Sequence, residues 1–108
     1  MPVIYKRLID GSMLTTAAVA YYTAPGETTG VIKQLTFCNT GDDVAAVTAF
    51  VGTAGNAHKL LDGHSIAGHE TLICYEALLH VVEAGGSIQA FADVAGVVNI
   101  IASGCEVA

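Results

Sequence analysis

Short apolar segments rich in β-branched residues recur along this chain, and turns that contain glycine separate them. This regular spacing is typical of a sandwich or a small barrel built from antiparallel strands. We therefore predict an all-β fold, an antiparallel β-sandwich or jelly-roll-like domain of about eight or nine short strands. The predicted strands are residues 3–9, 16–23, 29–39, 44–52, 58–61, 69–75, 77–82, 86–92 and 96–107.

Turn-forming sequences support several of these boundaries. Residues 24–27 place proline and then glycine at turn positions, and residues 39–42 link two strongly apolar segments. Further turns are expected at residues 52–56 and 84–87. Residues 76–83 have an alternative, because their apolar side chains also fall near helical spacing and would suit two turns of helix.

Two of the predicted strands carry apolar side chains on both faces. In residues 31–39, strict alternation puts Leu35 and Phe37 on one face and Ile32 on the other. Residues 97–107 alternate between two apolar faces in the same way. Such a strand lies either between two layers of one domain or against a neighbouring subunit, and in so small a sandwich the second explanation gains weight.

The low fraction of charged residues also suggests contact with a neighbouring subunit. Charged residues make up 13% of the chain, whereas about 25% is usual. With so little polar material to coat an isolated surface, part of that surface is expected to be covered by other subunits. We therefore predict an assembly component that forms a homo-oligomer.

The charge balance also bears on partners. The net charge is −6, and the only cations are Lys6, Arg7, Lys33 and Lys59. No basic stripe exists that would follow phosphates, so we expect no nucleic-acid binding. No apolar run approaches the roughly 18 residues of a membrane span, and the first residues lack a signal-peptide pattern. We expect no membrane association, and we expect synthesis in the cytoplasm.

The 108 residues suit a single β-sandwich domain over residues 1–108, without repeats or linkers. Residues 1–12 carry half of the cations. This segment is either an N-terminal arm that docks on an acidic neighbour or an edge strand on which lysine and arginine block aggregation, and we favour the edge strand.

Residues 56–70 are the most site-like stretch because they gather metal-ligand side chains. Their histidines are spaced by six and then five positions across glycine-containing loops, which matches none of the spaced metal signatures. We predict no metal and no other cofactor, and His64 and His69 are the candidates that a metal analysis would test.

No catalytic constellation is recognisable. Asp62, His64 and Ser65 suggest a hydrolytic triad, but adjacent strand residues such as His64 and Ser65 point to opposite faces. Nucleophile-elbow, P-loop and dinucleotide glycine patterns do not occur. The three cysteines, Cys38, Cys74 and Cys105, form no CxxC pair and are expected to be reduced, buried small hydrophobes. We predict that the chain is not an enzyme.

Aromatic residues offer contacts rather than a ligand platform. Tyr21 and Tyr22 are the only adjacent aromatic residues and the chain has no Trp, so a sugar-stacking site is weakly supported. By residue type, Tyr5, Arg7, Tyr21 and Tyr22 suit the hot spots of an assembly interface.

Two stretches resemble small bacteriophage virion proteins. Residues 22–41 read Tyr-Thr-Ala-Pro, a short Gly/Thr segment, an apolar strand and then Cys-Asn, and residues 86–107 resemble the closing pair of strands in the same proteins. Together they cover under half of the chain. The resemblance implies a small β-sandwich that attaches to an assembled head or tail, similar to capsid decoration or cement proteins, often as an oligomer. It brings no catalytic residues.

The leading hypothesis is therefore a virion structural protein, a capsid decoration or cement protein that binds the major capsid protein or other virion subunits. A tail or head-tail accessory subunit is the alternative, since residues 52–83 match no family pattern that would separate head from tail. The hypothesis from another class is a sugar-binding or metal-binding module that uses the loops of residues 56–70.

Overall fold

The computed structural model describes residues 2–108. The described chain forms nine strands and two single 3-10 helical turns, η1 (Asn56–His58) and η2 (Tyr75–Ala77). The strands are β1 (Val3–Met13), β2 (Val19–Thr23), β3 (Thr29–Asn39), β4 (Ala45–Val51), β5 (Lys59–Ile66), β6 (Thr71–Ile73), β7 (Val81–Val82), β8 (Ser87–Ala92) and β9 (Val98–Val107). The predicted all-β fold is thus confirmed.

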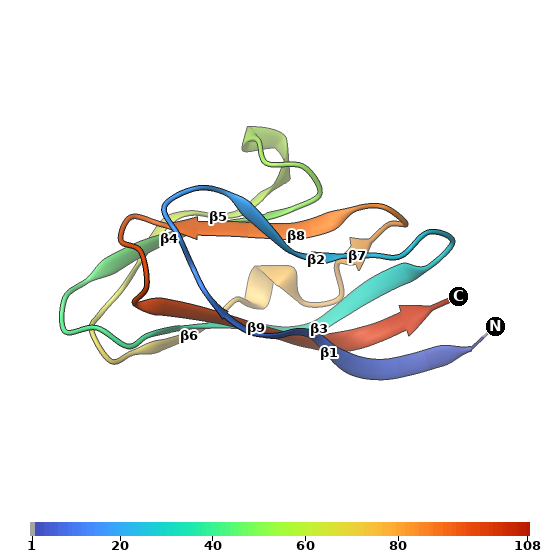
Figure 1. Cartoon of the computed structure of the whole chain (residues 1–108), viewed down its shortest axis with the longest axis horizontal. Helices are drawn as coiled ribbons and strands as arrows, with labels where there is room; N and C mark the ends of the chain where they lie inside the picture. The colour runs from blue at the N-terminus through green and yellow to red at the C-terminus, as the bar shows by residue number, and fades with distance from the viewer. Residues whose placement is uncertain (1) are drawn as a thin grey trace.

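Two antiparallel sheets face each other (Figure 1). One has the order β1-β9-β3-β6 with β7 also paired to β3, and the other has the order β2-β8-β4-β5. Strands therefore pair from the two chain ends inward, β1 with β9, β2 with β8, β3 with β6 and β7, and β4 with β5. This is a long hairpin rolled into two layers, the strand order of a jelly roll.

β6 and β7 together occupy one strand position. β6 pairs with the C-terminal part of β3 and β7 pairs with its N-terminal part, and η2 lies between them in the chain. The alternative of two helical turns over residues 76–83 is wrong, because only the 3-10 turn at Tyr75–Ala77 forms before the chain returns to β3.

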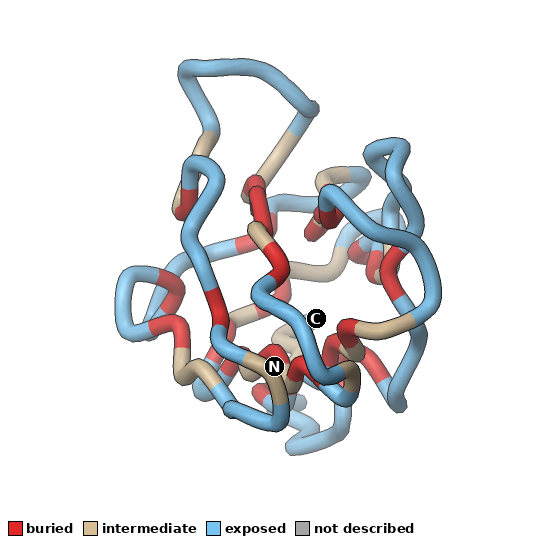
Figure 2. Tube along the Cα trace, turned by 90° about the vertical axis from the view of Figure 1, so that its left-hand side faces the viewer, coloured by how far each residue is buried: buried red, intermediate tan, exposed pale blue. Residues whose placement is uncertain are grey.

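The core lies between the sheets and is almost wholly apolar. In β9 the predicted alternation is confirmed, with Val98, Ile100 and Ala102 buried on the inner face. In β3 the predicted alternation is wrong: Ile32 is buried like Leu35 and Phe37, because a bulge between Ile32 and Gln34 adds one residue to the strand. Figure 2 shows these buried segments inside, and the loop before β5 standing fully outside them.

Two strands are longer than predicted, and in each a glycine lies inside the strand. Gly11 in β1 and Gly63 in β5 have φ values of 122° and 61°, which glycine adopts without strain. In β5 the Gly63 N–H donates to the Thr48 hydroxyl at 3.0 Å, so the irregular residue stays attached to β4. Each positive φ therefore accompanies a bulge inside the strand, beyond the point where the predicted strand ended.

β1 is an edge strand, as the favoured interpretation of residues 1–12 predicted. It is paired with β9 from Val3 to Met13, with register shifts between Arg7 and Ile9 and between Ile9 and Ser12. Bulges and charged side chains both discourage edge-to-edge pairing. They protect only the second half of β1, and the first half begins with three exposed apolar residues, Val3, Ile4 and Tyr5.

The buried side chain of Asn39 joins the loop after β3 to the end of β5 at one end of the sandwich. Its Nδ2 donates to the carbonyl oxygens of Asp43 at 2.8 Å and Ile66 at 2.9 Å, and its Oδ1 accepts from the Gly41 N–H at 3.0 Å. Every polar atom of the amide group therefore has a partner, as a buried polar group requires.

Asn39→Ala should lower the free energy of unfolding by about 3 kcal/mol, because it leaves buried backbone groups without partners. Urea denaturation followed by circular dichroism measures the change. Asn99→Ala is the control: Asn99 is half-buried and accepts one bond, from the Cys38 N–H at 3.2 Å, so about 1 kcal/mol is expected. Equal losses in the two variants would contradict the role given to Asn39.

Candidate functional site

The outer face of the five-stranded sheet carries two neighbouring rows of mostly apolar residues, which we call the apolar rows. Residues directly opposite each other in a sheet share a face. The register therefore aligns one row of Tyr5, Cys105, Val31 and Val81, and beside it a second row of Val3, Val107 and Thr29.

Both ends of the longer row are open to solvent. Tyr5 is 77% exposed and Val81 is also exposed, whereas Cys105 between Tyr5 and Val31 is buried. The rows lie where the chain ends meet, and the Ala108 N–H donates to the Pro2 carbonyl at 3.2 Å. Exposed apolar side chains gathered in register on a rigid sheet are a feature of interaction surfaces.

Two of the four cations, Arg7 and Lys33, lie beside the apolar rows, whereas the side chain of Lys6 alternates to the inner face. A shallow depression of about 420 Å³ is lined by Tyr5, Lys6, Arg7, Lys33, Ser103 and Gly104. Lys6 contacts Glu106 at 3.5 Å and Arg7 contacts Asp10 at 2.7 Å, and within residues 2–108 Lys33 makes no ion pair. This cationic depression and the apolar rows share Tyr5 and form one continuous surface.

The four predicted contact residues differ in how far they are exposed. Tyr5 and Arg7 are exposed on this surface and remain predictions as contacts. Tyr21 is half-buried, and its hydroxyl donates to the Met13 carbonyl at 3.4 Å. The prediction for Tyr22 is wrong: its side chain lies in the core, the residue is 8% exposed, and it has no surface to offer a partner.

Tyr22 instead closes the sandwich near the chain ends. Its hydroxyl donates to Glu106 Oε2 at 2.7 Å, and its ring lies so close to Gly30 that a Cβ there would be 2.9 Å from the Tyr22 hydroxyl. Burial raises the pKa of Tyr22 above its usual value, and the hydrogen bond and negative charge of Glu106 raise this pKa further. Tyr22 and Glu106 link the inner faces of the two sheets.

The histidines of residues 56–70 do not converge on one site. His58 lies beside Thr53, His64 lines a depression with Tyr75 and Glu76, and His69 pairs with Asp42 at 2.6 Å. Over residues 2–108, no three His, Cys, Asp or Glu side chains are grouped as a metal ion requires. The candidates His64 and His69 thus have separate surroundings.

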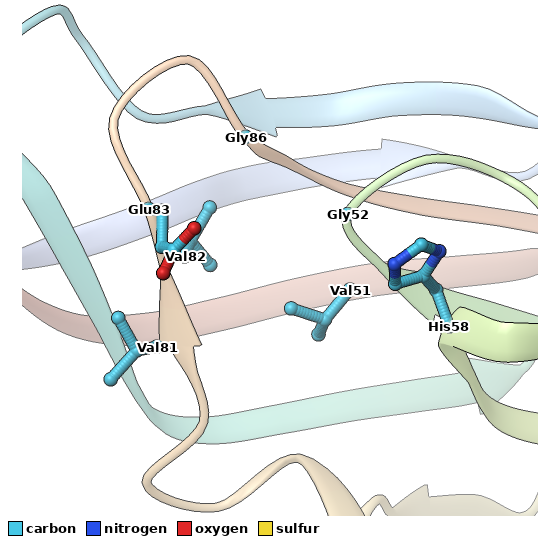
Figure 3. Close-up of a pocket in the computed structure, with 7 residues that line it drawn as sticks. All are labelled: Val51, Gly52, His58, Val81, Val82, Glu83 and Gly86. Atoms are coloured by element: carbon cyan, nitrogen blue, oxygen red, sulfur yellow. The ribbon is translucent and has the colours of Figure 1, made fainter.

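A small pocket lies between the loop before β5 and the β7–β8 turn (Figure 3). It has a volume of about 250 Å³, and its ionisable side chains are His58 and Glu83 above the apolar Val51, Val81 and Val82. Within residues 2–108, His58 and Glu83 form no hydrogen bond or ion pair with each other, and His58 lies beside Thr53. Among the described residues, no Ser, Thr, Cys or Lys lines the pocket.

The cysteines are all free, and they differ in burial. Cys74 and Cys105 are buried as predicted, whereas Cys38 is only half-buried, because it lies on the outer face of β3 opposite Asn99 and Thr71. Burial raises the pKa of the Cys74 thiol to about 11. A thiol that stays protonated at neutral pH is a poor nucleophile.

Comparison with known proteins found no matching family model, no similar curated protein and no similar solved structure. In the part of the chain that the structure describes, no helix has the length and hydropathy needed to cross a membrane. Sequence reasoning missed Val3, Val81 and Lys33 as parts of the candidate surface. The available signal was the alternation in each strand, but the sheet register was needed to align the rows.

Tyr22→Phe should lower the free energy of unfolding at pH 7 by about 1.5–3 kcal/mol, because a hydrogen bond to a charged group is lost. The folded chain keeps the Tyr22 proton to a higher pH than the unfolded chain, whose tyrosines titrate near about 10. Stability is therefore present below that pH and falls as the pH rises above it. The variant should show a shallower fall, measured by urea denaturation between about pH 9 and pH 11.

The neighbouring variant Tyr21→Phe is the control, because the Tyr21 hydroxyl makes only a long, exposed bond to Met13. It should change stability by less than about 0.5 kcal/mol and leave the alkaline slope as in the wild type. Identical slopes for Tyr22→Phe and the wild type would refute the inferred proton linkage.

Proposed function

We propose that this protein is a structural subunit of a bacteriophage particle, a capsid decoration or cement protein that binds and stabilises the assembled head. The observation that carries the proposal is the exposed pair of apolar rows, which a neighbouring subunit of the particle covers. The sequence resemblance of residues 22–41 and 86–107 to small virion proteins supports the same proposal.

The fold adds a general argument. Jelly rolls recur in viral capsid proteins, and also in lectins and cupins. A cupin-type metal centre would need a cluster of ligating side chains, and no group of three or more His, Cys, Asp or Glu is assembled within residues 2–108. Fold analogy alone is an association, so the proposal rests on the surface and the resemblance together.

The mechanism is mass action. A subunit that binds the assembled shell and not its free parts stabilises the shell by a free energy that grows with the logarithm of occupancy. Apolar residues supply this energy through burial, and Tyr5 has the residue type and exposure of an aromatic anchor. Many copies on one shell would sum these small contributions.

Tyr5→Ser should weaken the binding of the chain to assembled phage heads at least about tenfold, because it removes an aromatic anchor from the apolar rows. Binding is measured by co-sedimentation of the purified chain with heads over a range of concentrations. Tyr75→Ser is the matched control, since Tyr75 is 69% exposed but lies on η2, outside the apolar rows. It should bind like the wild type.

The experiment also separates the alternatives. Saturable addition to tails and not to heads would support the tail or head-tail accessory subunit. Failure to add to either particle would contradict the proposal. Stoichiometric zinc in the purified protein that is lost in the His64→Ala, His69→Ala double variant would favour the ligand-binding module instead.

A further inference from the structure

A second surface of the chain has the opposite charge to the cationic depression. At the far end of the sandwich, the loops after β3, β5 and β8 lie together, at the left of Figure 1, and carry four of the ten acidic residues. These are Asp42, Asp43, Glu70 and Asp93. We call this end the acidic tip.

The acidic tip also exposes apolar side chains. Val44 is 60% exposed and Val94 is 45% exposed, and both line a dent of about 110 Å³ with Asp42 and Asp43. The tip therefore combines apolar and anionic groups, whereas the apolar rows with the cationic depression combine apolar and cationic groups. Each surface therefore offers apolar side chains to the other, and their charges are opposite in sign.

The tip is held in one conformation. The Asn39 amide binds the loop after β3 to the end of β5, and the His69 N–H, in the loop after β5, donates to the Gly41 carbonyl at 3.1 Å. A Cβ at Gly68 would overlap the Asp42 carbonyl, so the two loops are in close contact. Such a preorganised surface loses little conformational entropy when it docks.

We propose that the acidic tip of one copy of this chain docks on the cationic depression and apolar rows of a second copy. Asp42 and Asp43 lie against Arg7 and Lys33, and Val44 and Val94 pack on Tyr5 and its row. The inference rests on the proposed function in one respect: bound copies are neighbours on the particle, and a second copy of this chain is the subunit of the particle that covers the apolar rows.

The charge of the chain favours a second copy as the partner over nucleic acid or lipid. A net charge of −6 disfavours nucleic acid or an anionic lipid surface, whereas the acidic tip presents anions on a protein surface of fitting chemistry. The Arg7–Asp10 pair is exposed and therefore weak, so Arg7 is free to exchange partners, and Lys33 makes no ion pair within residues 2–108. Because the two surfaces are different, the contact is head-to-tail and builds a ring or a filament.

A charge-reversal experiment on the purified chain tests the inference. By light scattering at low salt, the wild type should form an oligomer that dissociates when NaCl is raised to about 0.5 M, because salt screens exposed charges. Arg7→Glu with Lys33→Glu should be monomeric, and so should Asp42→Lys with Asp43→Lys. In an equal mixture the oligomer should re-form, because each intact surface meets an intact partner and the two reversed surfaces again carry opposite charges.

Lys59 provides the matched control. Lys33→Glu and Lys59→Glu change the net charge equally, but Lys59 lies on β5 and pairs with Asp62 at 2.9 Å, away from the depression. Lys33→Glu should weaken self-association at least about tenfold, and Lys59→Glu should leave it near the wild-type value. Circular dichroism of each variant checks that the fold is retained.

The outcomes distinguish this inference from the proposed function. A wild-type chain that stays monomeric at low salt, equal effects of Lys33→Glu and Lys59→Glu, or a mixture that remains monomeric would each overturn the head-to-tail contact. If such a monomer still adds saturably to phage heads, the proposed function stands without it. If the chain forms the predicted oligomer but binds neither heads nor tails, the contact stands and the proposed function fails.

Discussion

The central position of β3 is the constraint on which the rest of the structure depends. β3 is paired along both edges, with β9 on one side and with β6 and β7 on the other. Its inward side chains Ile32, Leu35 and Phe37 are fully buried and form the floor of the core. All of its partners come from residues 71–107, so β3 is satisfied only after most of the chain has been placed.

This dependence explains which parts of the fold the sequence predicts. The strands are local, and each is indicated by alternation and by turn residues on either side; the predicted range 29–39 agrees with β3. The sheet order is not local, because β1 meets β9 and β2 meets β8 across most of the chain. Bulges are the second feature that the sequence does not predict. The extra residue after Ile32 moves the following side chains of β3 to the opposite face of the sheet, and no residue type in the sequence indicates where it lies.

The same limit applies to the candidate site. Tyr5 and Arg7 were predicted as contacts by residue type alone, which says nothing about their neighbours. The adjacent Tyr21 and Tyr22 have the same type, yet a register shift between Ala20 and Tyr22 sends only Tyr22 into the core. The apolar rows join residues from four strands, so they become visible only when the register is known.

The bonds that close the fold also prepare its candidate surface. Tyr22 and Glu106 join the two sheets beneath the first half of β1, and the chain ends are bonded to each other at Ala108 and Pro2. These contacts hold Val3 and Tyr5 in the sheet although neither side chain is covered. A neighbour that covers them gains apolar burial without first having to order the strand, since the isolated domain has already ordered it. In a chain this poor in charge, Arg7 and Lys33 lie beside these residues, which is why we propose an anionic neighbour rather than a cationic one.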